Sequence, residues 1–549
     1  MLACPNCGAN LRFDPESQRL KCDFCGGDFD PEELKEGRGA DEQVVTETAP
    51  VPVTESGEQT EGEEESFSTY VFTCPQCGGE LLSYDDTLAT FCSFCGASTV
   101  LESRMSNEKR PKFIIPFRLT REESEAAYKK MVSRALFAPA KMKAEATVEN
   151  FRGIYMPYWI YGFDCNKHLN ITGTKTHRSG DYLITKYYDL TSDMLAEYEG
   201  ISYDASSSFA DSLSEAIAPF DSKEAVPFQS NYLSGFYADS SDVSEEIYRK
   251  QAEDMVRSDL AEEIRKAPGY HRYSIDGGQV LTAALPDKTT SERGMFPVWF
   301  LSTRMGDRVS YAVVNGQTGK VAADLPVSFT KYLIGSLILA VPLFFLFQTE
   351  YTIRPTTILT MSMGVSLISM LISNSQLNRI FAREHRLDDK GYNSTRSPEE
   401  VMKMREELKG LVKVKAGVEK SSSGKTLYIV FTCIFLFLLP AIGILMLIGW
   451  TSVLKDEGKS KKVVKPGKTV IKAPMKEKMK SLWKPLAAIG AAVLIFIANP
   501  VSDMYYYAGA LVSMALVGWS FWDVVQEHNM LSTRPLPQFG RRGGDENEH

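Results

Sequence analysis

Several patterns that would indicate catalysis are missing from this chain of 549 residues. It contains no H-E-x-x-H motif of zinc proteases, no G-x-S-x-G nucleophile motif and no paired-carboxylate motif. The nearest match to a phosphate-binding loop is SSSGKT at 421–426, but Glu419 stands where that loop requires glycine, and no apolar strand precedes it. These absences argue against the common nucleotide-dependent and hydrolytic enzymes. We therefore expect a protein that is not an enzyme.

A secretory signal is also missing, because no apolar run follows a positively charged start. We therefore expect the front of the chain in the cytosol, which is a reducing compartment. Eight of the ten cysteines lie in C-x-x-C pairs. In a reducing compartment that pattern indicates metal ligation rather than disulfide bonds.

The C-x-x-C pairs form two copies of one module, seventy residues apart, with fourteen residues between the two pairs in each copy. A glycine follows the second cysteine of every pair, which lets the backbone turn so that amide N–H groups face the thiolates. Four thiolates leave no position for substrate, so the sequence predicts two structural Zn²⁺ ions. Metal binding, on the order of 10 kcal/mol, would stabilise such short modules. The predicted ligands are Cys4, Cys7, Cys22 and Cys25 in the first copy and Cys74, Cys77, Cys92 and Cys95 in the second.

Basic residues are scarce in both copies. Residues 70–102 contain no Lys or Arg, and residues 1–28 contain three basic residues against four acidic ones. Nucleic-acid affinity depends largely on basic side chains that neutralise phosphates, so we expect the ribbons to recognise protein instead. The candidate contacts are the apolar side chains Phe24, Leu82, Phe91 and Phe94, and the alternative for several of them is packing around the zinc.

Residues 30–69 are acidic and poor in large apolar groups, which predicts a disordered linker. Such a linker would let the first ribbon range tens of ångströms from the second. Two weak contacts joined in this way gain from effective concentration, so we expect the pair of ribbons to capture a partner together.

Residues 108–326 have the pattern of a soluble α+β domain. Thr120 followed by Glu123 begins an amphipathic helix, and a longer helix is predicted within 239–266. Three strands joined by the turns MGDR and NGQTGK predict a β-meander over 296–326, in which Asn-Gly and Thr-Gly steps supply positive φ.

Two groups of residues in this domain have both a functional and a structural interpretation. Cys165, His168 and His177 are of metal-ligand type, but we favour a buried cysteine with surface histidines. An aromatic run has the chemistry of a base-stacking platform, but we favour core packing. Its members are Tyr155, Tyr158, Trp159 and Tyr161.

Apolar segments long enough to cross a bilayer fill the C-terminal part of the chain. Segments 329–347 and 356–373 predict one transmembrane hairpin, and segments 485–498 and 504–522 predict another. A further segment, 426–454, lies between the two hairpins.

The loop that follows this further segment, 455–484, carries eleven lysines, which the positive-inside rule places in the cytosol. Either segment 426–454 enters and leaves the membrane on one face, bending near Pro440, or it crosses once and the lysines lie outside. In the cytosol these lysines would also bind anionic lipids.

The predicted fold is multidomain, with two small zinc ribbons, an α+β cytosolic domain containing a β-meander, and a C-terminal α-helical transmembrane region. Its segments are zinc ribbon 1 over 1–29, the acidic disordered linker 30–69, zinc ribbon 2 over 70–103, the α+β domain 108–326, a transmembrane hairpin 327–375, a basic cytosolic loop 376–425, the membrane segment 426–454, the lysine-rich loop 455–484, a transmembrane hairpin 485–523 and a cytosolic tail 524–549.

Four blocks within about 70–375 resemble a known family. They are FIIPFRLTREESEAAYKKMVSRALFAP, RGIYMPYWIYGFD, AVPFQSNYLSGFYAD and FPVWFLSTRMGDRVSYAVVNGQTGKVAADLPV. These blocks resemble bacterial membrane-anchored zinc-ribbon proteins of the YdjG-like family, often labelled TFIIB-type zinc ribbon or primosomal, helicase-like proteins. The duplicated ribbon and the residues after about 376 depart from the family pattern.

The resemblance implies an anchor that recruits SPFH (flotillin-like) proteins to the bacterial inner membrane under envelope stress, together with PspA-like and TPM-domain proteins. We therefore expect a multi-pass scaffold or adaptor with its N-terminal domains in the cytosol. The alternative is a transport or lipid-handling protein that its zinc ribbons regulate. Against this alternative, the membrane segments contain almost no ionisable residues of the kind that mark a pathway.

Overall fold

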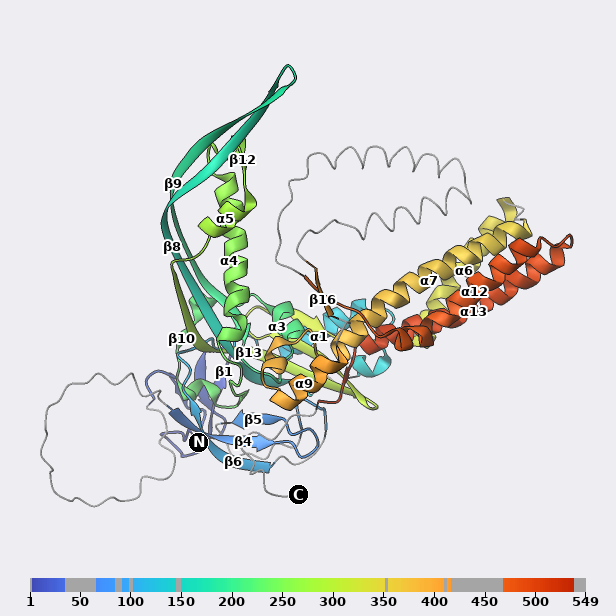
Figure 1. Cartoon of the computed structure of the whole chain (residues 1–549). Helices are drawn as coiled ribbons and strands as arrows, with labels where there is room; N and C mark the ends of the chain where they lie inside the picture. The colour runs from blue at the N-terminus through green and yellow to red at the C-terminus, as the bar shows by residue number, and fades with distance from the viewer. Residues whose placement is uncertain are drawn as a thin grey trace, which may run out of the picture.

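The computed structural model describes residues 2–34, 66–83, 91–97, 102–144, 150–350, 354–408, 412–415 and 468–537. These residues form a sheet-rich body from which a long β-hairpin and a bundle of helices extend (Figure 1). Most of the predicted linker, the SSSGKT segment and the membrane segment 426–454 lie outside the described residues.

The body is built on a sheet of thirteen strands. At its centre β8 (Arg152–Ser179) pairs antiparallel with β13 (Lys288–Met305). Tyr155, Tyr158 and Tyr161 on β8 are almost completely buried, so the aromatic run packs the core, as we favoured from the sequence. The body also contains β7 (Phe113–Ile114), β10 (Val226–Pro227), β11 (Tyr237–Ala238), β12 (Ser274–Ile275), β14 (Arg308–Asn315), β15 (Val321–Ala323) and β18 (Arg534–Pro535).

The predicted β-meander is confirmed, because β14 pairs antiparallel with both β13 and β15. Gly306 and Gly319 supply positive φ in its two turns. The prediction was wrong at Gly316, which is not among the glycines with positive φ. Asn315 holds that turn instead, since its side-chain oxygen accepts the backbone N–H groups of Gln317 and Thr318.

Helices cover the sheet and the base of the hairpin. Helix α1 (Arg121–Arg134) begins with the predicted capping box between Thr120 and Glu123. The longer predicted helix is α4 (Glu246–Lys266), which starts later than its sequence pattern suggested. The other short helices of the soluble part are α3 (Asp211–Ile217), α5 (Gly277–Ala283), α8 (Lys390–Ser394) and α9 (Pro398–Glu407), with 3₁₀ turns η1 (Ala140–Lys143), η2 (Ser222–Glu224), η3 (Ser230–Leu233) and η4 (Tyr270–Arg272).

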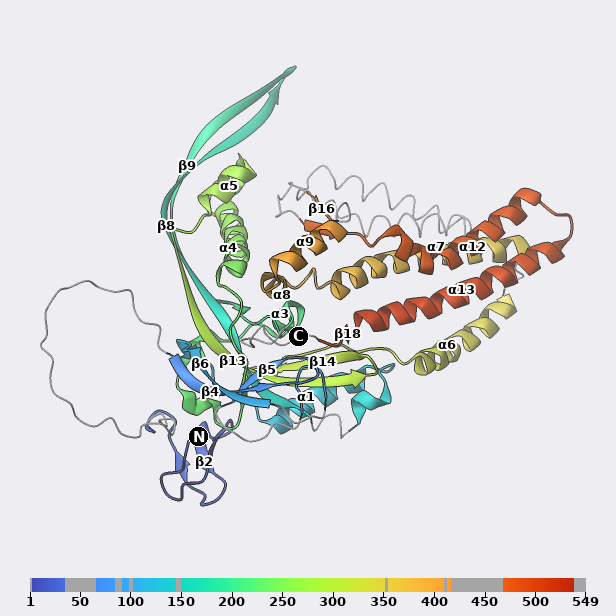
Figure 2. The same ribbon diagram turned by 60° about the horizontal axis from the view of Figure 1, so that its bottom comes forward.

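A hairpin of unusual length is formed by β8 and β9 (Tyr182–Asp204), joined through Gly180 and Asp181. At about 3.3 Å per residue, the 28 residues of β8 span on the order of 90 Å. Helices α4 and α5 lie along the lower part of the hairpin, and its tip projects beyond them (Figures 1 and 2). No pattern in the sequence predicted a hairpin of this length.

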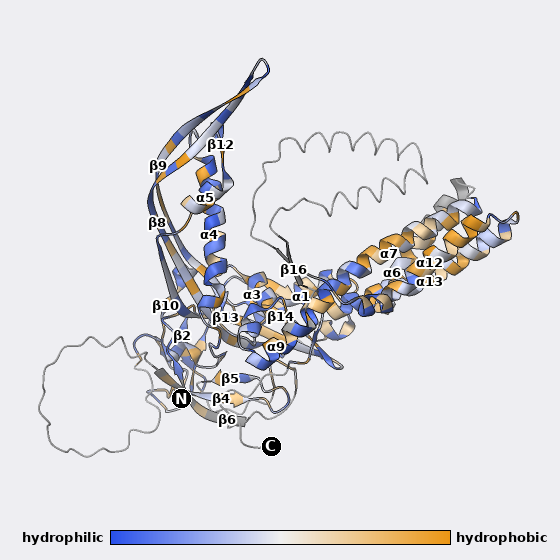
Figure 3. Ribbon diagram, in the orientation of Figure 1, coloured by the Kyte–Doolittle hydropathy of each residue, from blue (hydrophilic) through white to orange (hydrophobic). Residues whose placement is uncertain are grey.

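The apolar C-terminal segments form α6 (Phe329–Glu350), α7 (Pro355–Glu384), α12 (Met475–Ala498) and α13 (Asp503–Leu531). Helices α7, α12 and α13 pack together as a bundle, and α6 runs apart from them (Figure 2). Helices α7, α12 and α13 are long and apolar enough to span a membrane, while the apolar part of α6 found among the described residues is shorter. The hydropathy colours set the bundle apart from the body (Figure 3). Serines at three- and four-residue spacing line α7 inside the bundle, and the hydroxyl of Ser369 lies 2.7 Å from that of Ser520 on α13. Small residues of this kind let membrane helices approach closely.

The part of the chain between α7 and α12 contributes a separate two-stranded sheet. β16 (Val412–Lys415) pairs antiparallel with β17 (Lys468–Ile471), and Lys415 lies opposite Lys468. The described residues on either side of 416–467 are therefore neighbours in space.

Candidate metal centres

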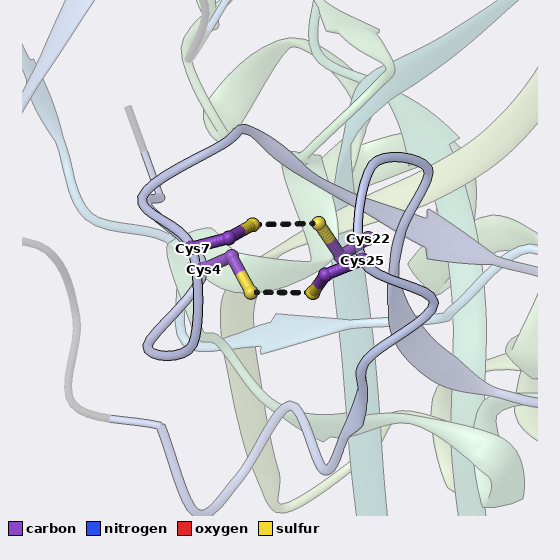
Figure 4. A group of neighbouring side chains, drawn as sticks. All are labelled: Cys4, Cys7, Cys22 and Cys25. Atoms are coloured by element: carbon purple, nitrogen blue, oxygen red, sulfur yellow. Dashed lines mark hydrogen bonds between the residues drawn. The ribbon is translucent and has the colours of Figure 1, made fainter.

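We call residues 2–34 the first module and residues 66–109 the second module. In the first module, strands β1 (Leu11–Asp14), β2 (Arg19–Cys22) and β3 (Asp28–Phe29) bring two cysteine pairs together. The Sγ atoms of Cys4 and Cys25 lie 3.5 Å apart, as do those of Cys7 and Cys22 (Figure 4).

In the second module, β4 (Ser66–Thr73), β5 (Glu80–Ser83) and β6 (Glu102–Lys109) support the other two pairs. Cys74 and Cys95 have Sγ atoms 3.8 Å apart, and those of Cys77 and Cys92 are 3.7 Å apart. A tetrahedron with bonds of about 2.3 Å separates its sulfurs by roughly 3.8 Å. All eight predicted ligands thus gather in two groups of four, each of which can hold a metal ion and is consistent with zinc.

The cysteine pairs share one local geometry. The predicted glycines, Gly8, Gly26, Gly78 and Gly96, have φ values of 75°, 71°, 70° and 69°. Each donates its N–H to the carbonyl oxygen of the cysteine four residues earlier. In the first module, backbone N–H groups of Cys25 and Phe24 lower the pKa of Cys22 to about 7, which favours the thiolate that binds metal.

The acidic linker predicted that the first module moves freely relative to the second. That prediction was wrong, because the first module packs against the body. The backbone N–H of Phe13 donates to Ser234, and its ring meets Tyr232 edge-on at 5.2 Å between centroids. The buried side-chain amide of Asn231 donates to the carbonyl oxygens of Pro31 and Leu34, both at 2.9 Å. The short turn η3 and the residues after it therefore form a dock for this module (Figure 2).

The second module is continuous with the body. Strand β5 pairs with β11, and β4 begins at Ser66, four residues before the predicted start of this ribbon. The ring of Phe94 meets Phe300 of β13 at 6.2 Å, and the hydroxyl of Tyr311 on β14 donates to the Phe94 carbonyl oxygen. All four of its cysteines are buried, whereas Cys7 and Cys25 of the first module are exposed.

Most of the predicted protein-contact residues are not on the surface. Leu82 and Phe94 are buried, and Phe91 is partly buried beneath the guanidinium of Arg152. The packing alternative therefore holds for Leu82 and Phe94, which are too buried to serve as protein contacts. Phe24 alone of the four candidates is exposed, at 82%.

Each basic residue of the first module has an acidic neighbour within the same module. Arg19 pairs with Asp28 at 2.6 Å, and Lys21 forms an ion pair with Asp14. Burial alone would raise the pKa of Asp14, but hydrogen bonds from Lys21 and Ser17 lower it to about 2. Arg12 lies 3.9 Å from Asp23. Such internal pairing reduces the charge available to a phosphate.

Cys165, His168 and His177 do not form a metal site. Cys165 is buried against the hairpin core, while both histidines are exposed. His168 instead pairs with Asp193 across the strands at 2.7 Å. No group other than the two sets of four cysteines meets the geometry of a metal site among the described residues.

One group of buried carboxyls has no counterpart in the sequence analysis. Asp204 ends β9, Asp211 begins α3 and Asp389 caps α8. Tyr248 and the backbone N–H of Lys390 donate to Asp211. Burial, with the charge of Asp211, raises the pKa of Asp389 to about 7 and that of Asp204 well above its usual range. Asp204 and Asp211 are near one another in the chain, but Asp389 comes from a distant segment, so sequence spacing did not reveal the group. The group joins the segment after α7 to the body.

The chain is similar to a protein named as the uncharacterized protein YdjG of Bacillus subtilis (strain 168). The two are 27% identical over 333 residues, which cover 60% of this chain and 90% of that protein. This similarity supports a YdjG-like relationship. No family model and no solved structure matches the chain.

Proposed function

We propose that the chain is a scaffold, not an enzyme, anchored in the bacterial inner membrane, and that its first module recruits a partner protein to that membrane. The comparison of Phe24 with Phe94 carries this proposal. The two residues occupy the same position in the duplicated module, seventy residues apart. Phe94 packs against β13, whereas Phe24 has no such cover and is exposed.

The partner that fits Phe24 is a protein with an apolar surface. Within this molecule, Phe94 shows what a phenylalanine at this position of the module contacts, namely an aromatic side chain on a sheet. Nucleic acid is a poorer partner because the nearby basic side chains already pair with acids of the same module.

The first module alone therefore contacts the partner protein, in place of the two mobile modules that the sequence predicted. The second module supports the body, and its own candidate contacts are covered. Two structural Zn²⁺ ions, one in each group of four cysteines, hold both modules in shape. The resemblance found in the sequence makes SPFH (flotillin-like), PspA-like and TPM-domain proteins the first partners to test, under envelope stress.

The topology that we propose places the body in the cytosol and returns both helical hairpins to it. Helix α6 leaves the body and α7 returns, and α12 and α13 repeat this path (Figure 2). The pairing of β16 with β17 supports the interpretation that segment 426–454 enters and leaves the membrane on one face. Accessibility labelling of a cysteine placed at Lys462 tests this, since labelling from outside the cell would contradict it.

A transport or lipid-handling role has less support. The serine hydroxyls inside the bundle bond to neighbouring helices or to their own helix backbone, as Ser366 does to the carbonyl oxygen of Ser362. They pack the helices together and are already hydrogen-bonded.

Affinity capture from detergent-solubilised membranes tests the scaffold proposal. We expect Phe24→Ser to lose an SPFH-type partner that the wild-type chain retains. Leu136→Ser is the matched control, because Leu136 is also exposed but lies on the body after α1. Equal capture by the wild type and Phe24→Ser would overturn the proposal, and loss by both variants would show a general surface effect.

A further inference from the structure

The tip of the β8–β9 hairpin carries large apolar side chains that nothing in the described chain covers. Tyr182 is 79% exposed, Leu183 75% and Tyr187 73%. They follow the loop at Gly180 and Asp181, beyond the part of the hairpin that α4 and α5 line. Exposed aromatic and aliphatic groups gathered at one end of an extension indicate a contact surface.

Basic side chains surround this apolar tip. Between residues 175 and 186 the chain has three Lys or Arg residues and one acidic residue, Asp181. The strand register places Lys175 directly opposite Lys186, so both lie on the same face of the ribbon. Like charges in this position destabilise a strand pair. Neither lysine has an ion-pair partner among the residues that the structure describes. An anionic surface beside the ribbon would relieve their repulsion.

The position of the tip indicates which surface this is. The hairpin and the bundle leave the body as two arms (Figures 1 and 2). Charged residues such as Lys484 and Asp523, which pair at 2.6 Å, mark the end of the bundle nearest the body. In both views, a plane perpendicular to the bundle axis at that end passes close to the hairpin tip. A membrane that holds the bundle therefore has its body-side surface at the level of the tip.

We propose that the β8–β9 tip rests on the surface of the membrane that holds the bundle. The tyrosines and leucine lie among the lipid headgroups, where aromatic side chains are favoured. Lys175 and Lys186 lie against anionic headgroups, which attract basic residues next to a membrane. The hairpin thereby gives the body a second contact with the bilayer, far from the helices, and holds its orientation relative to the membrane.

The test uses the full-length chain in vesicles with brominated phosphatidylcholine, which quenches tryptophan within the bilayer. Leu183→Trp places a reporter at the tip. Leu195→Trp is the matched control, since Leu195 is 83% exposed on the same strand but on the order of 40 Å from the tip. The native tryptophans contribute equally to both variants. We expect the added emission of Leu183→Trp to fall about twofold and that of Leu195→Trp to stay unchanged.

A second arm separates lipid contact from contact with a soluble protein. Lys175→Gln combined with Lys186→Gln should weaken the quenching of Leu183→Trp in vesicles containing phosphatidylglycerol and leave it unchanged in phosphatidylcholine alone. Metal content and thermal unfolding report that each variant is folded. Absence of quenching at Leu183→Trp, or equal quenching at Leu195→Trp, would overturn the proposal and leave the tip available to a protein partner.

Discussion

The two cysteine modules have the same ligand spacing and the same glycine geometry, yet they occupy different surroundings. In the second module all four cysteines are buried and the strands continue the central sheet. In the first module two cysteines are exposed. This module contacts the body through the ring of Phe13, which meets Tyr232, and through the hydrogen bonds that Asn231 donates to it. The duplicated phenylalanines follow this difference, since Phe94 is buried and Phe24 is exposed. A duplicated four-cysteine module can therefore be buried against the core in one copy and remain partly exposed in the other.

The sharpest way to break this comparison is to remove metal ligands from each module in turn. Replacing Cys92 and Cys95 by serine should lower the free energy of unfolding by several kcal/mol, on the order of 5, because the cage supports β13 and β14. Thermal unfolding of the detergent-purified chain measures this change. The matched pair Cys22→Ser and Cys25→Ser should leave the unfolding of the body nearly unchanged. Equal losses would mean that the modules have equivalent roles.

Truncating the duplicated phenylalanines sharpens the comparison at one position. Phe94→Ala should cost about 3–5 kcal/mol of stability, because it leaves a cavity against Phe300. Phe24→Ala should change stability by no more than about 0.5 kcal/mol, as expected for an exposed side chain. Denaturant unfolding of both variants gives the two values. A large loss for Phe24→Ala would show that this residue is packed in solution.

The dock of the first module can be opened without touching its metal. Phe13→Ala removes the ring that meets Tyr232 and should destabilise the docked state by about 3 kcal/mol. Hydrogen exchange at residues 230–236 should then become faster, while exchange in β13 stays unchanged. Unaltered exchange at 230–236 would contradict the docked arrangement.

The smallest expected effect is kinetic. A chelator should remove metal from the first module before the second, because two of its cysteines are exposed. Metal release followed with a chromogenic chelator should show two phases. Cys22→Ser combined with Cys25→Ser should abolish the faster phase only. A single phase in the wild-type chain would remove this distinction between the modules.

Local sequence was sufficient wherever the interacting residues lie close along the chain. The eight cysteines with their glycines, the capping box at Thr120 and the meander from β13 to β15 each depend on contacts within a few residues or between adjacent strands. The apolar segments likewise predicted membrane-length helices by composition and length alone.

Long-range packing could not be foreseen in the same way. Asn231 meets the first module across about two hundred residues, and the acidic composition of the intervening segment indicated freedom rather than docking. Leu82 is buried because β5 pairs with β11, and Phe94 is buried against β13 and β14, more than two hundred residues further along the chain. No local sequence pattern reveals either contact.

The sequence by itself determined where metal can bind and which segments are apolar enough for a membrane, because thiolate spacing and the length of apolar runs are local properties. Only the tertiary structure decided which module is buried, where the first module docks and how far the β8–β9 hairpin extends. Those outcomes depend on apolar area and hydrogen bonds shared between distant segments, and the free energy of such contacts exists only once the segments meet.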